Sequence, residues 1–129
     1  MNDPLPSDVR QFIAHQIESV AQLETLLLLR RDSQRQWGTD ELAQHLYISE
    51  KMCRVMLDDL EKRKYLVRNP LNKFVRYECS DARADAILAA LEGLYRERRV
   101  AIVSEIYSKP VSNVQTFADA FRLRKDEQP

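Results

Sequence analysis

The side chains best suited to chemistry in this sequence are six lysines and arginines that lie close together between residues 62 and 76. They are Lys62, Arg63, Lys64, Arg68, Lys73 and Arg76. Guanidinium and ammonium groups bind phosphate oxygens, so this cluster is a candidate anion-binding patch. The whole chain has 20 Lys and Arg against 20 Asp and Glu. Because the net charge is zero, binding to a polyanion has to come from a local patch of this kind.

The sequence carries no arrangement of residues that is typical of an enzyme. It has no nucleophile elbow, no glycine-rich phosphate loop and no histidine paired with a nucleophile, and it contains only two glycines. Asp58 and Asp59 are neighbours, so on a helix they point about 100° apart rather than converging on a substrate. No pair of Cys or His residues has the spacing of a metal site. We therefore expect no catalytic residue, no cofactor and no metal.

Cysteine usage and hydropathy indicate where the protein works. Two lone cysteines, Cys53 and Cys79, fit a reducing compartment better than a disulfide framework, and we interpret both as core residues rather than redox sensors. The longest purely aliphatic run, residues 26–29, is far shorter than the roughly 20 residues that span a bilayer. The first seven residues lack the pattern of a signal peptide. The expectation is a cytoplasmic protein that does not associate with membranes.

The elements that must position the basic patch are mainly helical and form a single domain over residues 1–129. Apolar residues recur at spacings of three and four, which predicts one N-terminal helix over 7–31 and one long C-terminal helix over 80–109. A capping-box pattern at Ser112 predicts a short terminal helix over 112–125. Candidate N-caps stand at the start of these two long helices and of two shorter ones between them, which end at about Leu46 and Lys64. They are Ser7, Thr39, Ser49 and Ser80.

One segment is typical of β-structure. Residues 65–68 and 74–79 are rich in β-prone side chains, and the intervening Asn69-Pro70-Leu71-Asn72 has the composition of a turn. This pattern predicts a small antiparallel hairpin that packs on the helices, because an isolated two-stranded hairpin is marginally stable in water. Before it, Trp37 and Gly38 form a short extended piece. The basic patch therefore lies on a helix exit and on the hairpin.

The two central helices have the apolar spacing of a helix-turn-helix pair. Leu42, Leu46 and Ile48 wedge the pair against the core, and Ala43 is small where the second helix crosses. The second helix has an apolar inner face and a polar outer face. Inner positions are Cys53, Met56, Leu57 and Leu60, and outer positions are Glu50, Lys51, Arg54, Val55 and Asp58.

With these motifs, residues 37–79 resemble the winged helix-turn-helix superfamily of bacterial transcription regulators. The superfamily pattern of a Leu-Ala pair, a Leu-Gly-Ile-Ser turn and a Leu-Glu-basic-basic-Gly exit becomes Leu42-Ala43, Leu46-Tyr47-Ile48-Ser49 and Leu60-Glu61-Lys62-Arg63-Lys64. Tyr47 and Lys64 stand in place of glycine, at positions where a left-handed backbone is often needed. The flanking helices are similar in arrangement to those of MarR-like and PadR-like regulators.

The resemblance implies binding to double-stranded DNA, with residues 49–64 as the recognition helix and residues 65–79 as the wing. The flanking helices have more apolar surface than one small subunit can cover, which predicts a homodimer. The resemblance places one group of side chains in the major groove and two groups beside the phosphate backbone or the minor groove. The major-groove residues are Ser49, Glu50, Lys51, Arg54 and Val55. The wing residues near the phosphate backbone or the minor groove are Arg68, Lys73 and Arg76. Thr39 and Gln44 contact phosphates beside the first helix of the pair. Arg54 is the candidate for bidentate recognition of guanine. The resemblance identifies no effector ligand.

The charge of residues 39–79 favours a second hypothesis. This segment holds eight Lys and Arg and seven Asp and Glu, and Asp58 and Asp59 lie midway along the presumed recognition helix. A balance of +1 gives weak attraction to DNA in an isolated domain, although dimerisation compensates by combining two modest half-sites. The alternative is an adaptor that docks another protein through the outer face of residues 49–58 and the hairpin.

Overall fold

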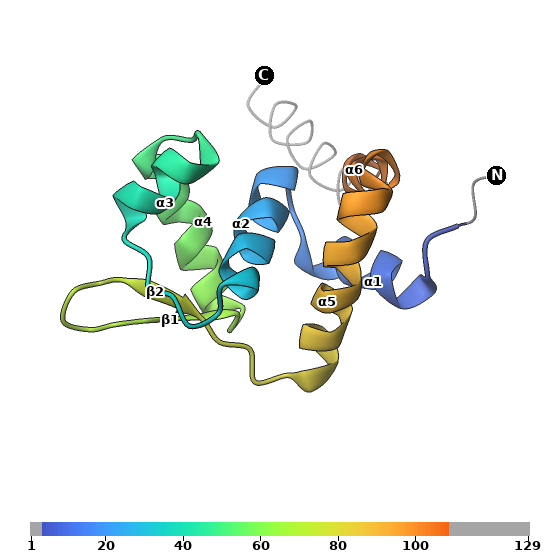
Figure 1. The fold of residues 1–129 in the computed structure, drawn as a ribbon. Helices are drawn as coiled ribbons and strands as arrows, with labels where there is room; N and C mark the ends of the chain where they lie inside the picture. The colour runs from blue at the N-terminus through green and yellow to red at the C-terminus, as the bar shows by residue number, and fades with distance from the viewer. Residues whose placement is uncertain (1–3, 109–129) are drawn as a thin grey trace, which may run out of the picture.

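The computed structural model describes residues 4–108, which form helices and one small antiparallel sheet (Figure 1). This is the mainly α architecture with a small hairpin that the sequence predicts. The elements in chain order are α1 Ser7–Gln16, α2 Val20–Arg31, α3 Thr39–Leu46, α4 Glu50–Lys62, β1 Leu66–Arg68, β2 Val75–Tyr77, α5 Ala82–Glu97 and α6 Arg99–Tyr107. The predicted helix over 112–125 lies outside the described residues.

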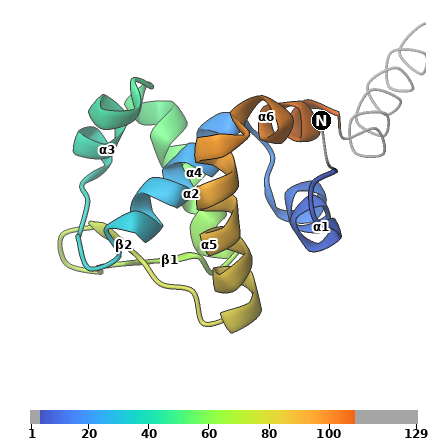
Figure 2. The ribbon, with the colours of Figure 1, turned by 45° about the vertical axis from the view of Figure 1, so that its right-hand side comes forward.

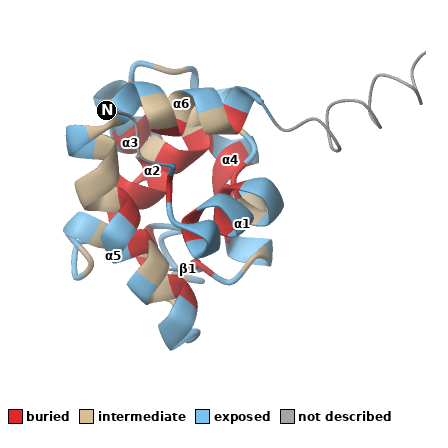
Figure 3. Ribbon diagram, turned by 90° about the vertical axis from the view of Figure 1, so that its right-hand side faces the viewer, coloured by how far each residue is buried: buried red, intermediate tan, exposed pale blue. Residues whose placement is uncertain are grey.

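Helix α2 lies at the centre of the molecule, between the α3–α4 pair with its hairpin and the terminal helices α1, α5 and α6 (Figures 1 and 2). Its leucines at 23 and 26–29 are all buried, as are the polar Gln22 and Thr25. A helix that is apolar on nearly every side needs covering on nearly every side. Buried residues accordingly face the interior from all the surrounding helices, while exposed residues lie on their outer faces (Figure 3).

The prediction of one continuous N-terminal helix over 7–31 is wrong, because the helix is interrupted between Gln16, the last residue of α1, and Val20, the first of α2. Ser19 caps α2, and its hydroxyl oxygen accepts a hydrogen bond from the Gln22 amide at 3.0 Å. The Gln22 side chain in turn accepts from the Glu18 amide at 2.7 Å. Ser-Val-Ala-Gln matches a capping box, a signal that the uninterrupted apolar periodicity conceals.

The single helix predicted over 80–109 is also two helices. Helix α5 ends at Glu97, and Arg98 has φ −132° and ψ 51°, after which α6 runs in a new direction (Figure 2). The change of direction places α6 against α1, where Ile102 and Ile106 are buried. Long-range packing rather than a local breaker residue accounts for the interruption, since no glycine or proline stands at residues 97–99.

The predicted caps are confirmed at one helix and displaced by one residue at three. Ser49 caps α4, accepting from the Met52 amide at 3.0 Å. Helices α1, α3 and α5 have Pro6, Gly38 and Asp81 as N-caps instead of the predicted hydroxyl residues. Asp81 rather than Ser80 caps α5, because its carboxylate accepts hydrogen bonds from the Arg83 and Ala84 amides of the first turn.

The hairpin is confirmed, with Val67 opposite Arg76 and a third extended residue beside it. Trp37 bridges Val75 through two backbone hydrogen bonds, of 2.8 and 2.9 Å, and its ring is buried. The short extended piece predicted before α3 therefore fastens the hairpin to the start of α3. Because β2 is bonded on both sides, the hairpin has a fixed base.

Within residues 4–108, three residues other than glycine have a left-handed backbone, and two of them are the positions where the sequence pattern lacks glycine. Tyr47 ends α3 with φ 58° and ψ 44°, and Lys64 follows α4 with φ 69°. The third, Lys73, has φ 67° in the hairpin turn. The prediction that 47 and 64 need this conformation is confirmed.

Tyr47→Gly is expected to stabilise the protein. A side chain in the left-handed region costs roughly 1–2 kcal/mol, part of which is offset by the greater freedom of glycine in the unfolded chain. The Tyr47 side chain is 95% exposed, so little packing is lost. We expect the free energy of unfolding in urea to rise by about 0.5–1 kcal/mol. Tyr47→Ala, which keeps the strained backbone, serves as the control, and equal stability of the two variants would contradict this account.

Candidate nucleic-acid interface

Helix α4 separates an apolar face from a polar one as the sequence predicts. Cys53, Leu57 and Leu60 are fully buried against the core, and Met56 is nearly so. The predicted outer residues are all exposed to solvent: Glu50, Lys51, Arg54, Val55 and Asp58. The outer face therefore offers cationic, apolar and acidic side chains side by side on a rigid helix.

The acidic residues of α4 beyond its first turn are held by arginines of the same chain. The Arg68 guanidinium donates to Asp58 at 3.0 Å and to Glu61 at 3.1 Å. The Arg63 guanidinium donates to Asp59 at 2.8 Å. The carboxylates that weaken the attraction of α4 for a polyanion thus have a counter-charge within hydrogen-bonding distance.

The cations of residues 39–79 therefore divide into two groups. Arg63, Arg68 and Arg76 are engaged in ion pairs, and the side chains of Arg63 and Arg68 are only 21% exposed. Five other cations of residues 39–79 have no hydrogen-bond or ion-pair partner for the side chain among residues 4–108. They are Lys51, Arg54, Lys62, Lys64 and Lys73. Within the same segment and by the same criterion, the free carboxylates are Asp40 and Glu50.

The tip of the hairpin is built by its asparagines. The Asn69 carbonyl oxygen of the side chain accepts from the Leu71 amide at 2.8 Å, and that of Asn72 accepts from the Phe74 amide at 2.9 Å. Backbone bonds between Asn69 and both Phe74 and Lys73 close the turn. Lys73 is thus presented from a hydrogen-bonded loop at the end of the hairpin that projects beyond the helices (Figure 1).

The remaining predicted contact residues lie at the edges of this surface. Thr39 is half-buried in the first turn of α3, while Gln44 is exposed on that helix. Ser49 uses its hydroxyl oxygen as the α4 cap, which leaves its O–H able to donate. Arg76 is half-buried and lies 4.0 Å from Glu78. Sequence reasoning places these residues on the right elements but gives no indication of their partners.

The base of the hairpin is tied to α2 and α5 by a cluster that sequence reasoning misses. The Tyr77 hydroxyl and the Arg30 guanidinium both donate to Asp85, at 2.5 and 3.0 Å. Both bonds lower the pKa of the Asp85 carboxyl, and the bond from Tyr77 has the larger effect. Burial and the bond to Asp85 raise the pKa of Tyr77. Arg30 lies 55 positions from Asp85 in the sequence, so no local pattern signals the cluster.

Comparison with known proteins identifies the fold. No protein-family model matches the chain, and no curated protein matches it in sequence. Its structure is similar to that of MepR, described as a transcription regulator of the Staphylococcus aureus multidrug efflux pump MepA, with a TM-score of 0.51 and 17% identity over 94% of this chain and 91% of that one. It is also similar to a MepR mutant from a multidrug-resistant S. aureus clinical isolate, with a TM-score of 0.53 and 17% identity over 95% and 88% of the two chains.

The protein has a winged helix fold. Helices α3 and α4 are its helix-turn-helix pair, and the β1–β2 hairpin is the wing. At 17% identity the similarity establishes this winged helix architecture and leaves the activity to be argued from the residues. None of the helices within residues 4–108 is long and apolar enough to cross a membrane.

Asp85→Asn is expected to destabilise the wing in a pH-dependent manner. Because the pKa of Asp85 is lowered in the folded state, its contribution to stability is fully present above the ordinary value of 3.8 and is lost as the pH falls through the folded value. The stability difference between wild type and variant in urea unfolding should be constant from pH 5 to 7 and narrow below about pH 4. A difference that stays constant down to pH 3 would contradict this assignment.

Proposed function

We propose that this protein is a transcription regulator that binds double-stranded DNA sequence-specifically, with α4 as the recognition helix. The observation that carries the proposal is the segregation of charge on α4. Lys51 and Arg54 are exposed and unpaired within the described chain, while Asp58, Asp59 and Glu61 are bound by arginines. The N-terminal half of this helix therefore presents cations to a polyanion without competition from neighbouring carboxylates other than Glu50.

The side chains on the outer face of α4 have the chemistry needed to read base edges. Arg54 donates in the fork geometry that matches the two acceptors of guanine, and Val55 offers an apolar contact for a thymine methyl group. Glu50 accepts from the amino group of cytosine, and Lys51 and Ser49 reach bases or phosphates beside it. All except Ser49, the cap, lie within the first six residues of α4.

The wing supplies phosphate contacts that hold α4 in register. Lys73 is the first choice because it is exposed, unpaired within residues 4–108 and held in a closed turn. Arg76 assists from β2, and Thr39 and Gln44 contact phosphates beside α3. Arg68 needs to exchange one of its carboxylates for a phosphate to join them, so we assign it a smaller part.

The protein acts as a homodimer in this proposal, joined through its terminal helices. Helix α6, which packs against α1 and α5, carries an exposed apolar side chain, Val100, that is 80% exposed. A two-fold dimer presents two recognition helices to pseudo-palindromic half-sites about 34 Å apart, one turn of DNA. Two modest half-sites then combine into one specific site through their effective concentration.

The adaptor hypothesis rests on the balanced charge of residues 39–79 and on the acidic pair Asp58 and Asp59. Both carboxylates already face arginines of their own chain, at 3.0 and 2.8 Å. This pairing leaves Lys51 and Arg54 as exposed cations on the outer face, which favours DNA over a protein partner there. The role of MepR as a transcription regulator supports the same choice.

Arg54→Ala and Lys73→Ala are expected to affect DNA binding differently. Loss of a base contact relaxes specificity at one position and costs about 1–3 kcal/mol on the preferred duplex. Loss of a phosphate contact weakens binding to all duplexes alike and reduces the slope of log affinity against log salt by about 1. Fluorescence anisotropy with the preferred and a scrambled duplex at several salt concentrations measures both effects. Unchanged affinity in both variants would overturn this docking.

Val100→Asp is expected to convert the dimer to a monomer, because it places a charge in the apolar contact. Sedimentation equilibrium measures the change. Leu71→Asp is the matched control, since Leu71 is 92% exposed but lies on the wing, and it should leave the dimer intact. A wild-type protein that sediments as a monomer at tens of micromolar would exclude the dimer.

A further inference from the structure

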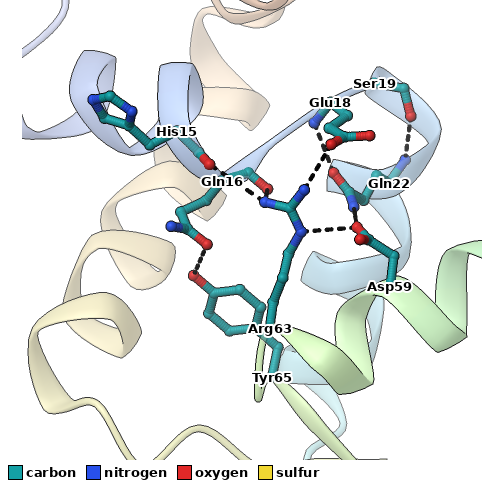
Figure 4. A network of polar contacts seen from close by, with 8 residues as sticks. All are labelled: His15, Gln16, Glu18, Ser19, Gln22, Asp59, Arg63 and Tyr65. Carbon is teal, nitrogen blue, oxygen red and sulfur yellow. Dashed lines mark hydrogen bonds and ion pairs between the residues drawn. The ribbon is translucent and has the colours of Figure 1, made fainter.

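One guanidinium group joins the recognition helix to the end of α1. Arg63, the residue that ends α4, points into the space between α1, α2 and its own helix (Figure 4). Its Nη1 donates to the backbone oxygens of His15 and Gln16 at 3.3 and 3.1 Å. Its Nη2 donates to Glu18 at 2.7 Å. With the Nε bond to Asp59, all three nitrogens are engaged.

The carbonyls of His15 and Gln16 are the last two of α1, and the end of a helix leaves such carbonyls without partners in the helix itself. The end of a helix also carries partial negative charge, which a cation stabilises. Arg63 therefore acts as a cap supplied by a residue 47 positions away in the sequence. A lysine cannot replace it, because a single ammonium group does not reproduce the planar set of donors.

Two neighbouring contacts extend this junction. The Gln22 side chain, nearly buried at the start of α2, donates to the same Asp59 oxygen at 2.5 Å. The Tyr65 hydroxyl donates to the Gln16 side chain at 3.1 Å, and the Tyr65 ring lies edge-on to Phe12. The junction between α1 and α2 is thus hydrogen-bonded to the end of α4 and to Tyr65, which lies just before β1 (Figure 4).

The elements joined here belong to two different packing groups. Helix α1 packs against α5 and α6, while α4 packs against α3 and β1. In the proposed dimer the first group forms the subunit contact and the second contacts DNA. The Arg63 junction is therefore placed where the orientation of one group relative to the other is set.

We propose that Arg63 is a positioning residue that fixes the orientation of the recognition helix relative to the dimerisation helices. This inference rests on the proposed function. Hydrogen bonds to base edges require accurate placement of both helices of a dimer, whereas phosphate contacts tolerate displacement. The junction should therefore govern discrimination between sequences rather than general affinity for DNA.

The test compares Arg63→Ala and Arg63→Lys with Arg30→Ala. Arg30 is a matched control because its side chain is also 21% exposed and pairs with two carboxylates. It joins α2 to α5, shares Asp85 with Tyr77 at the base of the wing and has no hydrogen bond to α4 within residues 4–108, so its loss should affect phosphate contacts alike on both duplexes. Each variant is titrated with the preferred duplex and with a scrambled duplex at one salt concentration. The melting temperature of each variant is measured in parallel.

In Arg63→Ala we expect the ratio of specific to scrambled affinity to fall about tenfold, with affinity for the scrambled duplex changed by less than about twofold. Arg63→Lys should recover little of this ratio. Arg30→Ala should lower the melting temperature comparably while leaving the ratio unchanged. An unchanged ratio in Arg63→Ala, or an equal fall in Arg30→Ala, would overturn the inference.

A second measurement tests the junction without DNA. Nitroxide labels are attached at Gln11→Cys on α1 and at Met52→Cys on α4, in a Cys79→Ser background. Double electron–electron resonance then measures the distance between the two labels. Both label sites are exposed, and Cys53 is fully buried. Arg63→Ala should broaden the distance distribution and Arg30→Ala should not. An unchanged width would refute the junction, whereas broadening in a protein that discriminates no duplex would refute only the proposed function.

Discussion

The burial of α2 is the constraint on which the rest of the structure depends. Its run of leucines leaves only a narrow stripe for solvent, so the helix has to be enclosed from both sides (Figure 3). The helix-turn-helix pair and the wing cover one side, and the terminal helices cover the other (Figure 1). Each buried leucine contributes about 1.5–3 kcal/mol on transfer from water, which is enough to hold short elements that are unstable alone. The outer face of α4 is exposed as a consequence of this enclosure.

Arginines form the ion pairs that join elements of this structure, whereas most of the cations left for binding are lysines. Arg30, Arg63 and Arg68 each pair with two carboxylates, and the planar groups of Arg30 and Arg63 join elements that lie apart in the sequence. The unpaired cations of the helix-turn-helix and wing are lysines, except for Arg54. A count of charges alone gives nearly zero for this region, whereas the pairing leaves a local excess of cations on α4 and the wing tip. The charge balance of the sequence is therefore a poor guide to the field that a ligand meets.

Local patterns were sufficient to predict the helix-turn-helix, the hairpin and the two left-handed positions at Tyr47 and Lys64. Each of these follows from apolar spacing or from backbone geometry within a few residues. The helix interruptions at Ser19 and Arg98 are harder to predict from the sequence, because the apolar stripe continues through both. The first carries a capping box that the stripe conceals, and the second depends on the packing of α6 against α1.

The candidate interface was predictable by element but not by partner. The exposure of Lys51, Arg54 and Val55 follows from the helical period. The ion pairs of Arg63 with Glu18 and of Arg68 with Asp58 and Glu61 join residues 45, 10 and 7 positions apart, so no helical spacing rule reveals them. Arg63 was grouped by sequence with the phosphate-binding cations, and the structure instead places it on Glu18, Asp59 and the end of α1 (Figure 4).

Selection of bound duplexes from a pool of random sequence tests the central claim most directly, because it assumes no operator. The account predicts enrichment of two inverted half-sites with centres about 10 base pairs apart, each containing an invariant guanine that becomes variable in the Arg54→Ala protein. Bound sequences that are indistinguishable from the starting pool after several rounds would contradict it.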